Sequence, residues 1–219
     1  MKTDTILQLA EIFISIQGES SHAGLACVFI RLSGCNLRCS FCDSRYTYEE
    51  PGTPYPLPYL LEFVDRHPHA LVELTGGEPL LQEGVYELMD ELLLRDRTVL
   101  LETNGSISLA RVQPGIIKIM DLKCPGSGMS DRMDLKNLAL LNAKDEIKFV
   151  IANRLDFDWA IHMIKVHGLL NKEGNILFSP AANAMLPRDL ARWILDANLP
   201  VRLQIQLHKL LWPEMDRGI

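Results

Sequence analysis

The residues of this chain with the clearest chemical potential are three cysteines near the N-terminus, Cys35, Cys39 and Cys42, in the pattern Cys-x-x-x-Cys-x-x-Cys. They lie in a short loop between an apolar strand and a polar stretch of the chain. Three thiolates hold three irons of a cubane iron–sulfur cluster and leave the fourth iron open, whereas electron-transfer ferredoxins usually fill all four positions with cysteine. The spacing therefore predicts a 4Fe-4S cluster with one iron available for chemistry.

Other uses of the cysteines have less support. A structural zinc site normally takes four ligands in paired Cys-x-x-Cys knuckles, and here only Cys39 and Cys42 form such a pair. We interpret Cys27, which falls within an apolar strand, as a small buried side chain. Cys124 stays open as a fourth ligand, although nothing near it in the sequence supports that role. Five cysteines in 219 residues without a secretory signal indicate a reducing compartment rather than a disulfide framework.

The composition fits one globular domain over residues 1–219. Hydrophobic residues make up 47% and charged residues 23% of the chain, and a chain of this length buries a substantial core. The net charge of −6 argues against a nucleic-acid partner, which needs clustered Lys and Arg. No apolar run reaches the ~20 residues that span a bilayer, and the N-terminus lacks a signal-peptide pattern. We expect a cytoplasmic protein without a membrane partner.

Apolar strands alternate with amphipathic helices along the chain. We expect strands at residues 9–14, 28–32, 72–75, 99–101, 116–120, 147–151, 175–178 and 201–205, and helices at 57–67, near 85–93, 135–141, 157–166 and 187–197. Interleaved strands and helices predict an α/β fold with a mostly parallel sheet. A complete eight-fold barrel takes about 250 residues, so this shorter chain predicts a partial, open TIM-like barrel.

Unusual polar residues follow five of the predicted strands directly. These segments are residues 76–79, 102–105, 121–123, 179–180 and 206–209. Because the carboxyl ends of parallel strands gather at one mouth, where ligands bind, we expect these segments to surround one site together with the cysteine loop. Gly76 and Gly77 lack side chains and let the backbone approach a ligand closely, while Glu78 places a carboxylate beside them.

The cysteine loop, with Phe41 before its last cysteine, and the Gly-Gly-Glu-Pro sequence at residues 76–79 resemble the radical S-adenosylmethionine (SAM) superfamily. The finer resemblance is to the 7-carboxy-7-deazaguanine synthase (QueE) family of queuosine biosynthesis. It is carried by residues 11–13, 16–19, 42–44, 75–79, 102–105, 121–125 and 206–209. This resemblance implies a radical SAM lyase that contracts the ring of 6-carboxy-5,6,7,8-tetrahydropterin, with loss of ammonia, to the 7-deazapurine 7-carboxy-7-deazaguanine.

The resemblance also implies which residues hold the cofactors, and it assigns no catalytic residue. Cys35, Cys39 and Cys42 would hold the cluster, and Ser44 would offer a hydroxyl to a magnesium ion where many family members carry Thr. SAM contacts would come from Phe41, Cys42, Asp43, Gly77, Glu78, Asn104, Asp121, Leu122 and Lys123.

The substrate contacts that the resemblance implies come from both ends of the chain. They are Ile16, Gln17, Gly18, Glu19, Arg31, Thr75, His208 and Pro213. The residue type supports one of them independently, because an Arg that points inward from an apolar strand needs an anionic partner. For Arg31 that partner is either the substrate carboxylate, which a planar guanidinium binds in a bidentate way, or a salt bridge at the end of the barrel.

Two alternative functions stay open from the sequence. A glycyl-radical enzyme activase has a similarly short barrel and the same cluster loop, but it acts on a protein backbone and would leave the mouth uncovered. A non-catalytic iron–sulfur carrier would bind no SAM. By resemblance we also expect a homodimer, since an open barrel leaves strand edges that need cover, and an electron donor such as a flavodoxin.

Overall fold

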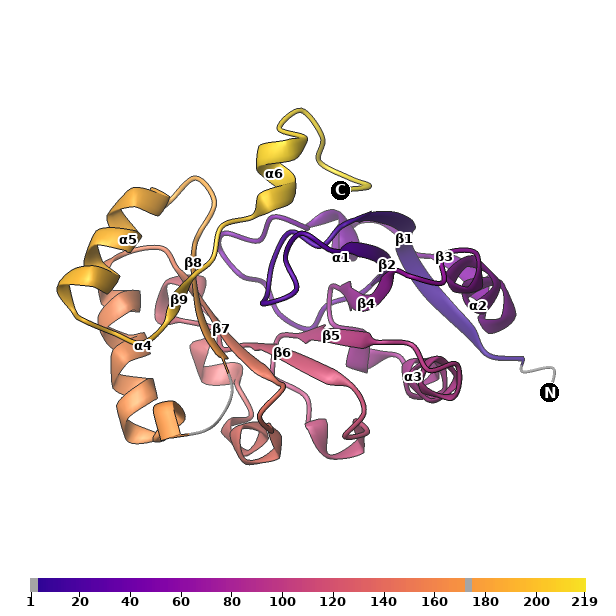
Figure 1. The fold of residues 1–219 in the computed structure, drawn as a ribbon, viewed down its shortest axis with the longest axis horizontal. Helices are drawn as coiled ribbons and strands as arrows, with labels where there is room; N and C mark the ends of the chain where they lie inside the picture. Colours follow the sequence, from indigo (N-terminus) through magenta and orange to yellow (C-terminus); the bar gives the residue numbers. More distant parts are fainter. Residues whose placement is uncertain (1–3, 172–174) are drawn as a thin grey trace.

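The computed structural model of this chain describes residues 4–171 and 175–219. Within them nine strands form one sheet in the order β3-β1-β2-β4-β5-β6-β7-β8-β9 (Figure 1). Neighbouring strands from β2 to β9 pair in parallel, whereas β1 pairs antiparallel with both β2 and β3. The edge strands β3 and β9 do not pair with each other, so the curved sheet stays open. The predicted partial barrel is confirmed.

The strands and helices have the following bounds. The strands are β1 (Ile6–Ile16), β2 (Ala26–Leu32), β3 (Thr53–Pro56), β4 (Leu71–Gly76), β5 (Val99–Thr103), β6 (Ile117–Asp121), β7 (Glu146–Ile151), β8 (Asn175–Pro180) and β9 (Arg202–Leu203). The α-helices are α1 (Tyr46–Glu49), α2 (Leu57–Asp65), α3 (Gly84–Leu94), α4 (Arg154–Val166), α5 (Pro187–Asp196) and α6 (Leu207–Leu211).

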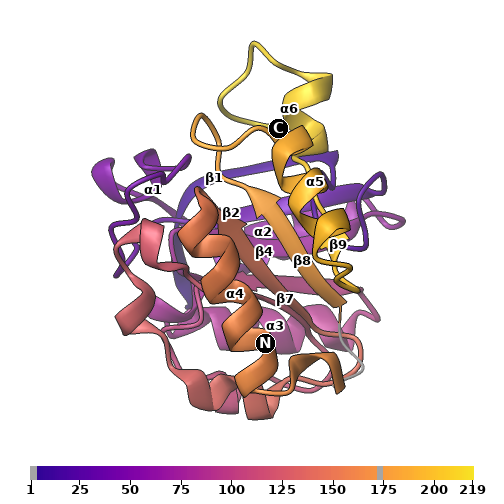
Figure 2. The same ribbon diagram turned by 90° about the vertical axis from the view of Figure 1, so that its left-hand side faces the viewer.

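The longer helices begin at start signals in the sequence and cover the outside of the sheet. Pro58 and Pro187 lie in the first turns of α2 and α5, where a missing N–H costs no hydrogen bond. Before α4, the side-chain oxygen of Asn153 accepts a hydrogen bond from the backbone N–H of Asp156 at 3.0 Å, which caps the helix. Figure 2 shows α4 and α5 beside β7 and β8, and α3 packs on β1 and β5.

The two faces of the sheet differ in chemistry, because successive side chains of a strand point to opposite sides. The face toward the helices is apolar. It is built from residues such as Val28, Ile30, Val72, Leu74, Leu101, Ile147, Phe149, Ile176 and Phe178, all members of one buried cluster. The opposite, concave face carries the charged side chains of the same strands. The hydrophobic core therefore lies between sheet and helices, and the hollow of the barrel is left for polar groups.

The structure differs from the predicted elements in three places. Residues 135–140 form a 3-10 helix instead of an α-helix, because the buried Asn137 amide ties this segment to the backbone of Gly105, Ile107 and Leu109. The last strand shortens to the two residues of β9, although the backbone N–H of Gln204 still donates to the carbonyl oxygen of Phe178 in β8 at 2.9 Å. Three short elements, α1, β3 and α6, are additional, and α6 occupies the segment predicted as a polar strand end.

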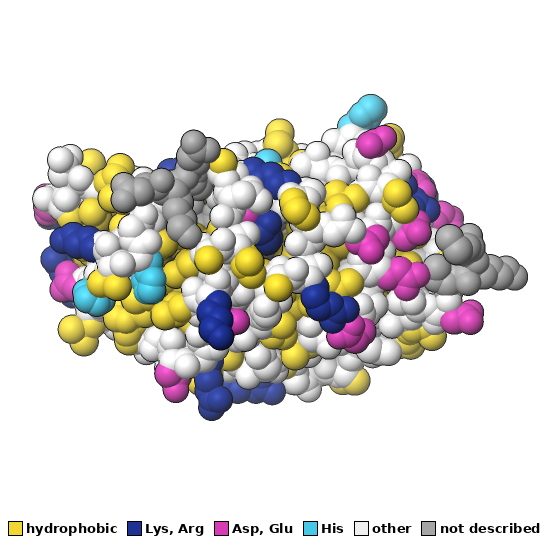
Figure 3. Space-filling view, turned by 90° about the horizontal axis from the view of Figure 1, so that it is seen from below, with side chains coloured by type: hydrophobic (Ala, Val, Ile, Leu, Met, Phe, Trp, Pro, Cys, Tyr) yellow, Lys and Arg dark blue, Asp and Glu magenta, His cyan; other side chains and the backbone are white. Residues whose placement is uncertain are grey.

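Surface charge is mixed in the described part of the chain. On the face seen in Figure 3, Lys and Arg side chains stand apart among hydrophobic and acidic ones and form no continuous basic surface. None of the helices described here combines the length and the apolar composition that crossing a membrane requires.

Candidate active site

A cavity of about 530 Å³ opens at the carboxyl ends of the parallel strands, within the usual size range of small-molecule sites. The cysteine loop lies over it, and α6 with the C-terminal tail covers another side (Figure 1). Of the predicted site residues, the cavity is lined by Gln17, Glu19, Arg31, Cys35, Cys39, Phe41, Cys42, Asp43, Ser44, Thr75, Gly77, Asn104, Asp121, Lys123, His208 and Pro213. The tertiary structure thus brings together residues from seven segments of the chain.

Four predicted residues, Ile16, Gly18, Glu78 and Leu122, do not line the cavity. Glu78 is fully buried, and its carboxylate accepts hydrogen bonds from the backbone N–H groups of Leu80 and Asn104 at 3.0 and 2.7 Å. The side chain therefore anchors the turn after β4 to the end of β5. Its predicted contact with SAM stays a prediction that this arrangement does not favour.

The cysteine loop is held by close backbone packing at its start. Gly34 has φ of +90°, and a Cβ at Gly77 would lie 2.0 Å from the carbonyl oxygen of Gly34. Gly76 has φ of +135°, and a Cβ there would lie 2.1 Å from the carbonyl oxygen of Leu32. Side chains at either of these positions after β4 would push the loop away. The glycine pair thus seats the cysteines directly above the strand ends.

The three cysteines suit a cluster better than a single metal ion. Cys35, Cys39 and Cys42 are half-buried, unpaired and line the same cavity. No three His, Cys, Asp or Glu side chains in the described residues are placed to share one metal ion. A cubane cluster does not require that, because each of its irons takes one thiolate. The donor set fits a 4Fe-4S cluster that these three thiolates would hold at the cavity.

Cys124, by contrast, is buried among the apolar side chains on the helix-facing side of the sheet. It does not line the cavity, so it is not a fourth ligand in this structure. Cys27 is also fully buried, within β2, as predicted.

Beside the cysteine loop lies an ion pair whose carboxylate has one oxygen without a hydrogen-bond partner. Lys123 Nζ donates to Asp121 Oδ2 at 2.6 Å, while Asp121 Oδ1 is buried without a hydrogen-bond partner in the described chain. Partial burial lowers the pKa of Lys123, but Asp121 and Cys39 outweigh it and raise the pKa above its usual value. An unpaired buried carboxylate oxygen is costly. It fits a ligand with hydroxyl or ammonium donors, such as SAM.

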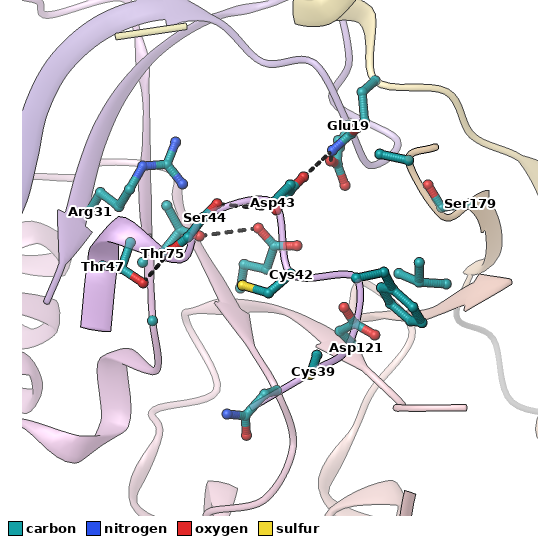
Figure 4. Close-up of a pocket in the computed structure, with 18 of the residues that line it drawn as sticks. Glu19, Arg31, Cys39, Cys42, Asp43, Ser44, Thr47, Thr75, Asp121 and Ser179 are labelled. Atoms are coloured by element: carbon teal, nitrogen blue, oxygen red, sulfur yellow. Dashed lines mark hydrogen bonds between the residues drawn. The ribbon is translucent and has the colours of Figure 1, made fainter. Parts of the chain in front are cut away.

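Arg31 combines both roles that the sequence left open. Its Nε donates to Glu11 Oε1 at 2.7 Å, and the phenolic hydroxyl of Tyr46 donates to the same oxygen at 2.8 Å. The two terminal nitrogens of Arg31 make no hydrogen bond within the described residues and are not sealed off from solvent, and Arg31 lines the cavity. In Figure 4, Arg31, Ser44 and Thr75 lie on one side of the view and Asp121 and Ser179 on the other. The salt bridge orients a guanidinium whose free edge suits an anion.

Ser44 sits in a polar chain that leads to the C-terminal segment. Its hydroxyl donates to Asp43 Oδ1 at 3.1 Å, and Asp43 Oδ2 accepts from Gln206 and Lys209, both at 3.1 Å. The hydroxyl and the carboxylate are oxygen ligands of the kind that Mg²⁺ prefers. The oxygens fit the ion, which would complete its shell with water and substrate.

Sequence reasoning missed a buried charge network in the hollow of the barrel. Lys148 Nζ donates to Glu19 Oε2 at 2.8 Å and also bonds Glu102. Burial lowers the pKa of Lys148, but the two carboxylates raise it well above its usual value. Glu19 also accepts from Gln204 and Gln206, both at 2.9 Å, so its oxygens are occupied. The available signal was a charged residue flanked by apolar ones within a strand.

His208 approaches the site from α6. A Cβ at Gly18 would lie 2.1 Å from His208 Nδ1, so the imidazole packs directly on the turn after β1. Burial lowers the pKa of His208 below its usual value, which leaves the ring neutral at neutral pH. Gly18 and His208, each predicted as a substrate contact, therefore lie against each other, although only His208 lines the cavity.

Comparison with known proteins agrees with this geometry. The model of the radical SAM superfamily matches residues 29–120. The 7-carboxy-7-deazaguanine synthase of Chlorobaculum tepidum is 44% identical over 222 residues, which cover 100% of both chains. The enzyme of that name from Koribacter versatilis is 42% identical over 226 residues, 97% of this chain and 100% of the relative. The crystal structure of QueE from Escherichia coli has a TM-score of 0.75 at 23% identity, covering 93% of this chain and 95% of its own.

Proposed function

The chain belongs to the 7-carboxy-7-deazaguanine synthase family of radical SAM enzymes, and from that premise we propose that it converts 6-carboxy-5,6,7,8-tetrahydropterin to 7-carboxy-7-deazaguanine with loss of ammonia. The observation that carries the proposal is one cavity that joins the three cysteines to an Arg31 with a free guanidinium edge. A cluster site alone fits any radical SAM enzyme. An anion site within the same cavity selects a small acidic substrate.

The 4Fe-4S cluster and SAM, when bound, supply abstraction of a hydrogen atom from the substrate. Cys35, Cys39 and Cys42 hold the cluster, and the spare oxygen of Asp121 accepts a hydrogen bond from SAM. α6 and the C-terminal tail cover the cavity and limit the entry of water, which protects reactive species. This cover also disfavours a glycyl-radical activase, whose mouth must admit a polypeptide.

On the substrate side, Arg31 binds the carboxylate through its terminal nitrogens, and Glu11 keeps the guanidinium in place. Thr75 offers its hydroxyl, which now donates to Glu102 Oε2 at 3.1 Å. The neutral His208 ring closes the cavity from α6, where it is able to accept or donate one hydrogen bond. Ile16, Gly18 and Leu122 do not line the cavity, so their predicted contacts with substrate or SAM are not part of this proposal.

Magnesium is the third component that we propose, with Ser44 as its one hydroxyl ligand. The support is the oxygen pair of Ser44 and Asp43 at the cavity wall. The test is turnover at varied magnesium concentration for wild type, Ser44→Thr and Ser44→Ala. We expect Ser44→Thr to match wild type and Ser44→Ala to need at least about tenfold more magnesium. An unchanged magnesium dependence of Ser44→Ala would rule out this ligand.

We further propose a domain organisation, an oligomeric state, an electron donor and a location for the protein. Residues 1–219 would act as one domain, since a single sheet spans the described chain. A homodimer would cover an open sheet edge, which analytical ultracentrifugation tests. A flavodoxin is the proposed electron donor, and the cytoplasm the proposed location, because cluster thiolates need a reducing environment.

The decisive experiment is an anaerobic reaction of the cluster-loaded protein with SAM, a reductant and 6-carboxytetrahydropterin. We expect 7-carboxy-7-deazaguanine, identified by mass spectrometry, and 5′-deoxyadenosine that depends on the pterin. Formation of 5′-deoxyadenosine without the deazapurine would contradict the proposed substrate and favour an activase. Absence of both, with intact cluster, would favour an iron–sulfur carrier.

A further inference from the structure

The floor of the cavity holds a buried carboxyl group, Glu73, to which the proposed reaction gives no role so far. Glu73 lies in β4, is only 4% exposed and lines the cavity. Its Oε2 accepts a hydrogen bond from the Gln17 side chain, while Oε1 has no hydrogen-bond partner within the described residues. Burial raises the pKa of Glu73 to about 8. Oε1 is not among the fully buried oxygens that lack a partner in the described chain, so it is reachable from the cavity, where a ligand with N–H donors would meet it.

The neighbouring Gln17 fixes the orientation of this carboxyl group. Gln17 is 2% exposed, and its side-chain oxygen accepts from the backbone N–H of Glu19 at 3.0 Å. Its backbone is also held, with N bonded to Leu25 O at 2.8 Å. Because Gln17 is tied at both ends, Glu73 keeps one oxygen occupied and one free. This is an arrangement prepared for a ligand.

The position of Glu73 relative to Arg31 follows from strand register. In the β2–β4 pairing, Arg31 lies opposite Thr75, and Phe29 lies opposite Glu73. The two levels are two residues apart along the strands, which is about 7 Å. A bicyclic ligand is long enough to reach both residues, with its own carboxylate at Arg31 and the N–H groups of its far ring at Glu73.

Phe29 supplies an apolar surface at the same level as the carboxyl group. Its side chain lines the cavity, and Phe13 stacks behind it with ring centroids 5.0 Å apart and an interplanar angle of 12°. A fixed aromatic pair beside a hydrogen-bonding group is the combination that recognises a flat heterocycle.

We propose that Glu73 binds the N–H edge of a 2-aminopyrimidinone ring whose carboxylate end is held by Arg31. The ring N–H and the amino group of such a heterocycle are parallel donors, which match the two oxygens of a carboxylate. Two such donors favour the charged form, so binding releases to solvent the proton that the buried carboxyl holds in the free protein. Oε2 keeps its bond to Gln17, since each carboxylate oxygen has two acceptor sites. This inference rests on the proposed function and adds the residue that distinguishes a pterin from other flat acids.

The test compares two stable ligands by titration calorimetry with the cluster-loaded protein under anaerobic conditions. 6-Carboxypterin carries the 2-amino group, and 6-carboxylumazine carries a carbonyl oxygen in its place. We expect wild type to bind the pterin at least about tenfold more tightly. Glu73→Gln exchanges one acceptor for a donor, so it should reverse the preference in favour of the lumazine. An unchanged preference in this variant overturns the proposal.

A matched control guards against a general effect of losing a buried charge. Glu146 is equally buried in β7, accepts a hydrogen bond from the backbone N–H of Ser21 at 3.0 Å and does not line the cavity. Glu146→Gln should keep the wild-type preference for the pterin. Because each variant is judged by the ratio of two ligands, partial loss of folded protein does not mimic the result. A reversed preference in Glu146→Gln as well also overturns the proposal.

Turnover separates this inference from the proposed function. Wild type that prefers the pterin but forms no deazapurine contradicts the proposed function and leaves the Glu73 subsite standing. Wild type that forms the deazapurine, beside a Glu73→Gln variant with unchanged KM for the tetrahydropterin, contradicts the subsite alone. With both correct, we expect Glu73→Gln to raise KM at least about tenfold and to lower kcat by a smaller factor.

Discussion

The two faces of the sheet do different work with the same strands. In β4, Val72 and Leu74 pack into the core under the helices, while Glu73 and Thr75 between and after them line the cavity. In β7, Ile147 and Phe149 enter the core on either side of Lys148, which faces the cavity. Because side chains alternate along a strand, a residue that stabilises the core and a residue that lines the cavity are direct neighbours in the sequence.

The two faces of the sheet contribute differently to the free energy of unfolding. Burial of large apolar side chains on the helix-facing side contributes about 1.5–3 kcal/mol each. The buried ion pairs on the concave side contribute little net stability, because desolvation offsets their attraction. They are nevertheless sensitive, since loss of one partner leaves a buried charge alone. Buried charges on the concave face are therefore stable only while each of them keeps a partner of opposite charge.

The cysteine loop gives the largest expected contrast between the two faces. Cys39→Ala should abolish formation of the deazapurine, because the cluster loses one of its three thiolates. Anaerobic assays with iron and sulfide analysis measure this, and circular dichroism should show a retained fold.

The matched control for that change is Cys124→Ala on the helix-facing side. It should keep full activity and lose about 1 kcal/mol of unfolding free energy for a small core truncation. Loss of cluster in Cys124→Ala would mean that the fourth position of the cluster is not open.

Lys148→Met tests the charge network of the concave face. Removing the ammonium leaves Glu19 and Glu102 close together without their shared partner, so we expect a loss of about 3–5 kcal/mol and a raised KM. Urea denaturation and steady-state kinetics measure the two effects.

The comparison variant is Lys118→Met, which breaks the equally buried pair of Lys118 and Asp145 (2.9 Å) outside the cavity. It should lose similar stability but keep the wild-type KM. If both variants raise KM equally, the separation of the two faces is wrong.

Leu74→Ala probes the core side of the strand that carries Glu73 and Thr75. Truncation of this fully buried side chain should cost about 2–5 kcal/mol with KM unchanged in the remaining folded protein. Thr75→Val, at the next position of the strand, should change the urea midpoint little but raise KM. Equal kinetic effects from the two substitutions would contradict the comparison.

The last expected effect is a pH dependence of stability from Glu73. Its pKa is raised to about 8 in the folded protein, against about 4.3 in an unfolded chain. Between these values the folded state binds the proton more tightly, so this group's contribution to stability is complete below pH 4 and falls as pH rises toward 8. The slope is at most about 1.4 kcal/mol per pH unit.

Glu73→Gln removes this contribution. Urea denaturation of wild type and variant at pH 5.5, 6.5 and 7.5 should show that the variant gains on wild type as pH rises. A difference between the two proteins that is constant over this range would show that Glu73 does not bind the proton with a raised pKa.

Much of the site was predictable where chemistry depends on local spacing. The three cysteines lie within one short loop, and the glycine pair follows its strand directly, so neighbouring residues suffice to indicate them. Arg31 was also indicated, because a charge in an apolar strand requires a partner. The same reasoning applied to Glu73 and Lys148 would have marked them, since both interrupt apolar strands.

Other parts of the site depend on contacts across the chain. Lys148 in β7 contacts Glu19, in the turn after β1, across 129 positions of sequence, and Glu102 joins them from β5. Glu78 has the right neighbours in sequence but turns away from the cavity, because Thr103 and the backbone N–H of Asn104 bind its carboxylate. Periodicity indicated the strands but not the shortness of β9, which depends on how many of its residues pair with β8.

The amino-acid sequence by itself determined the cluster loop and the alternation of apolar and polar residues, because covalent spacing and the two-residue period of a strand are local properties. Only the tertiary structure decided which carboxylates share a lysine, which oxygen stays free on the cavity floor and which segments cover the mouth. These outcomes depend on the register of strands distant in sequence and on the need to pair every buried charge, and neither is a property of any one segment.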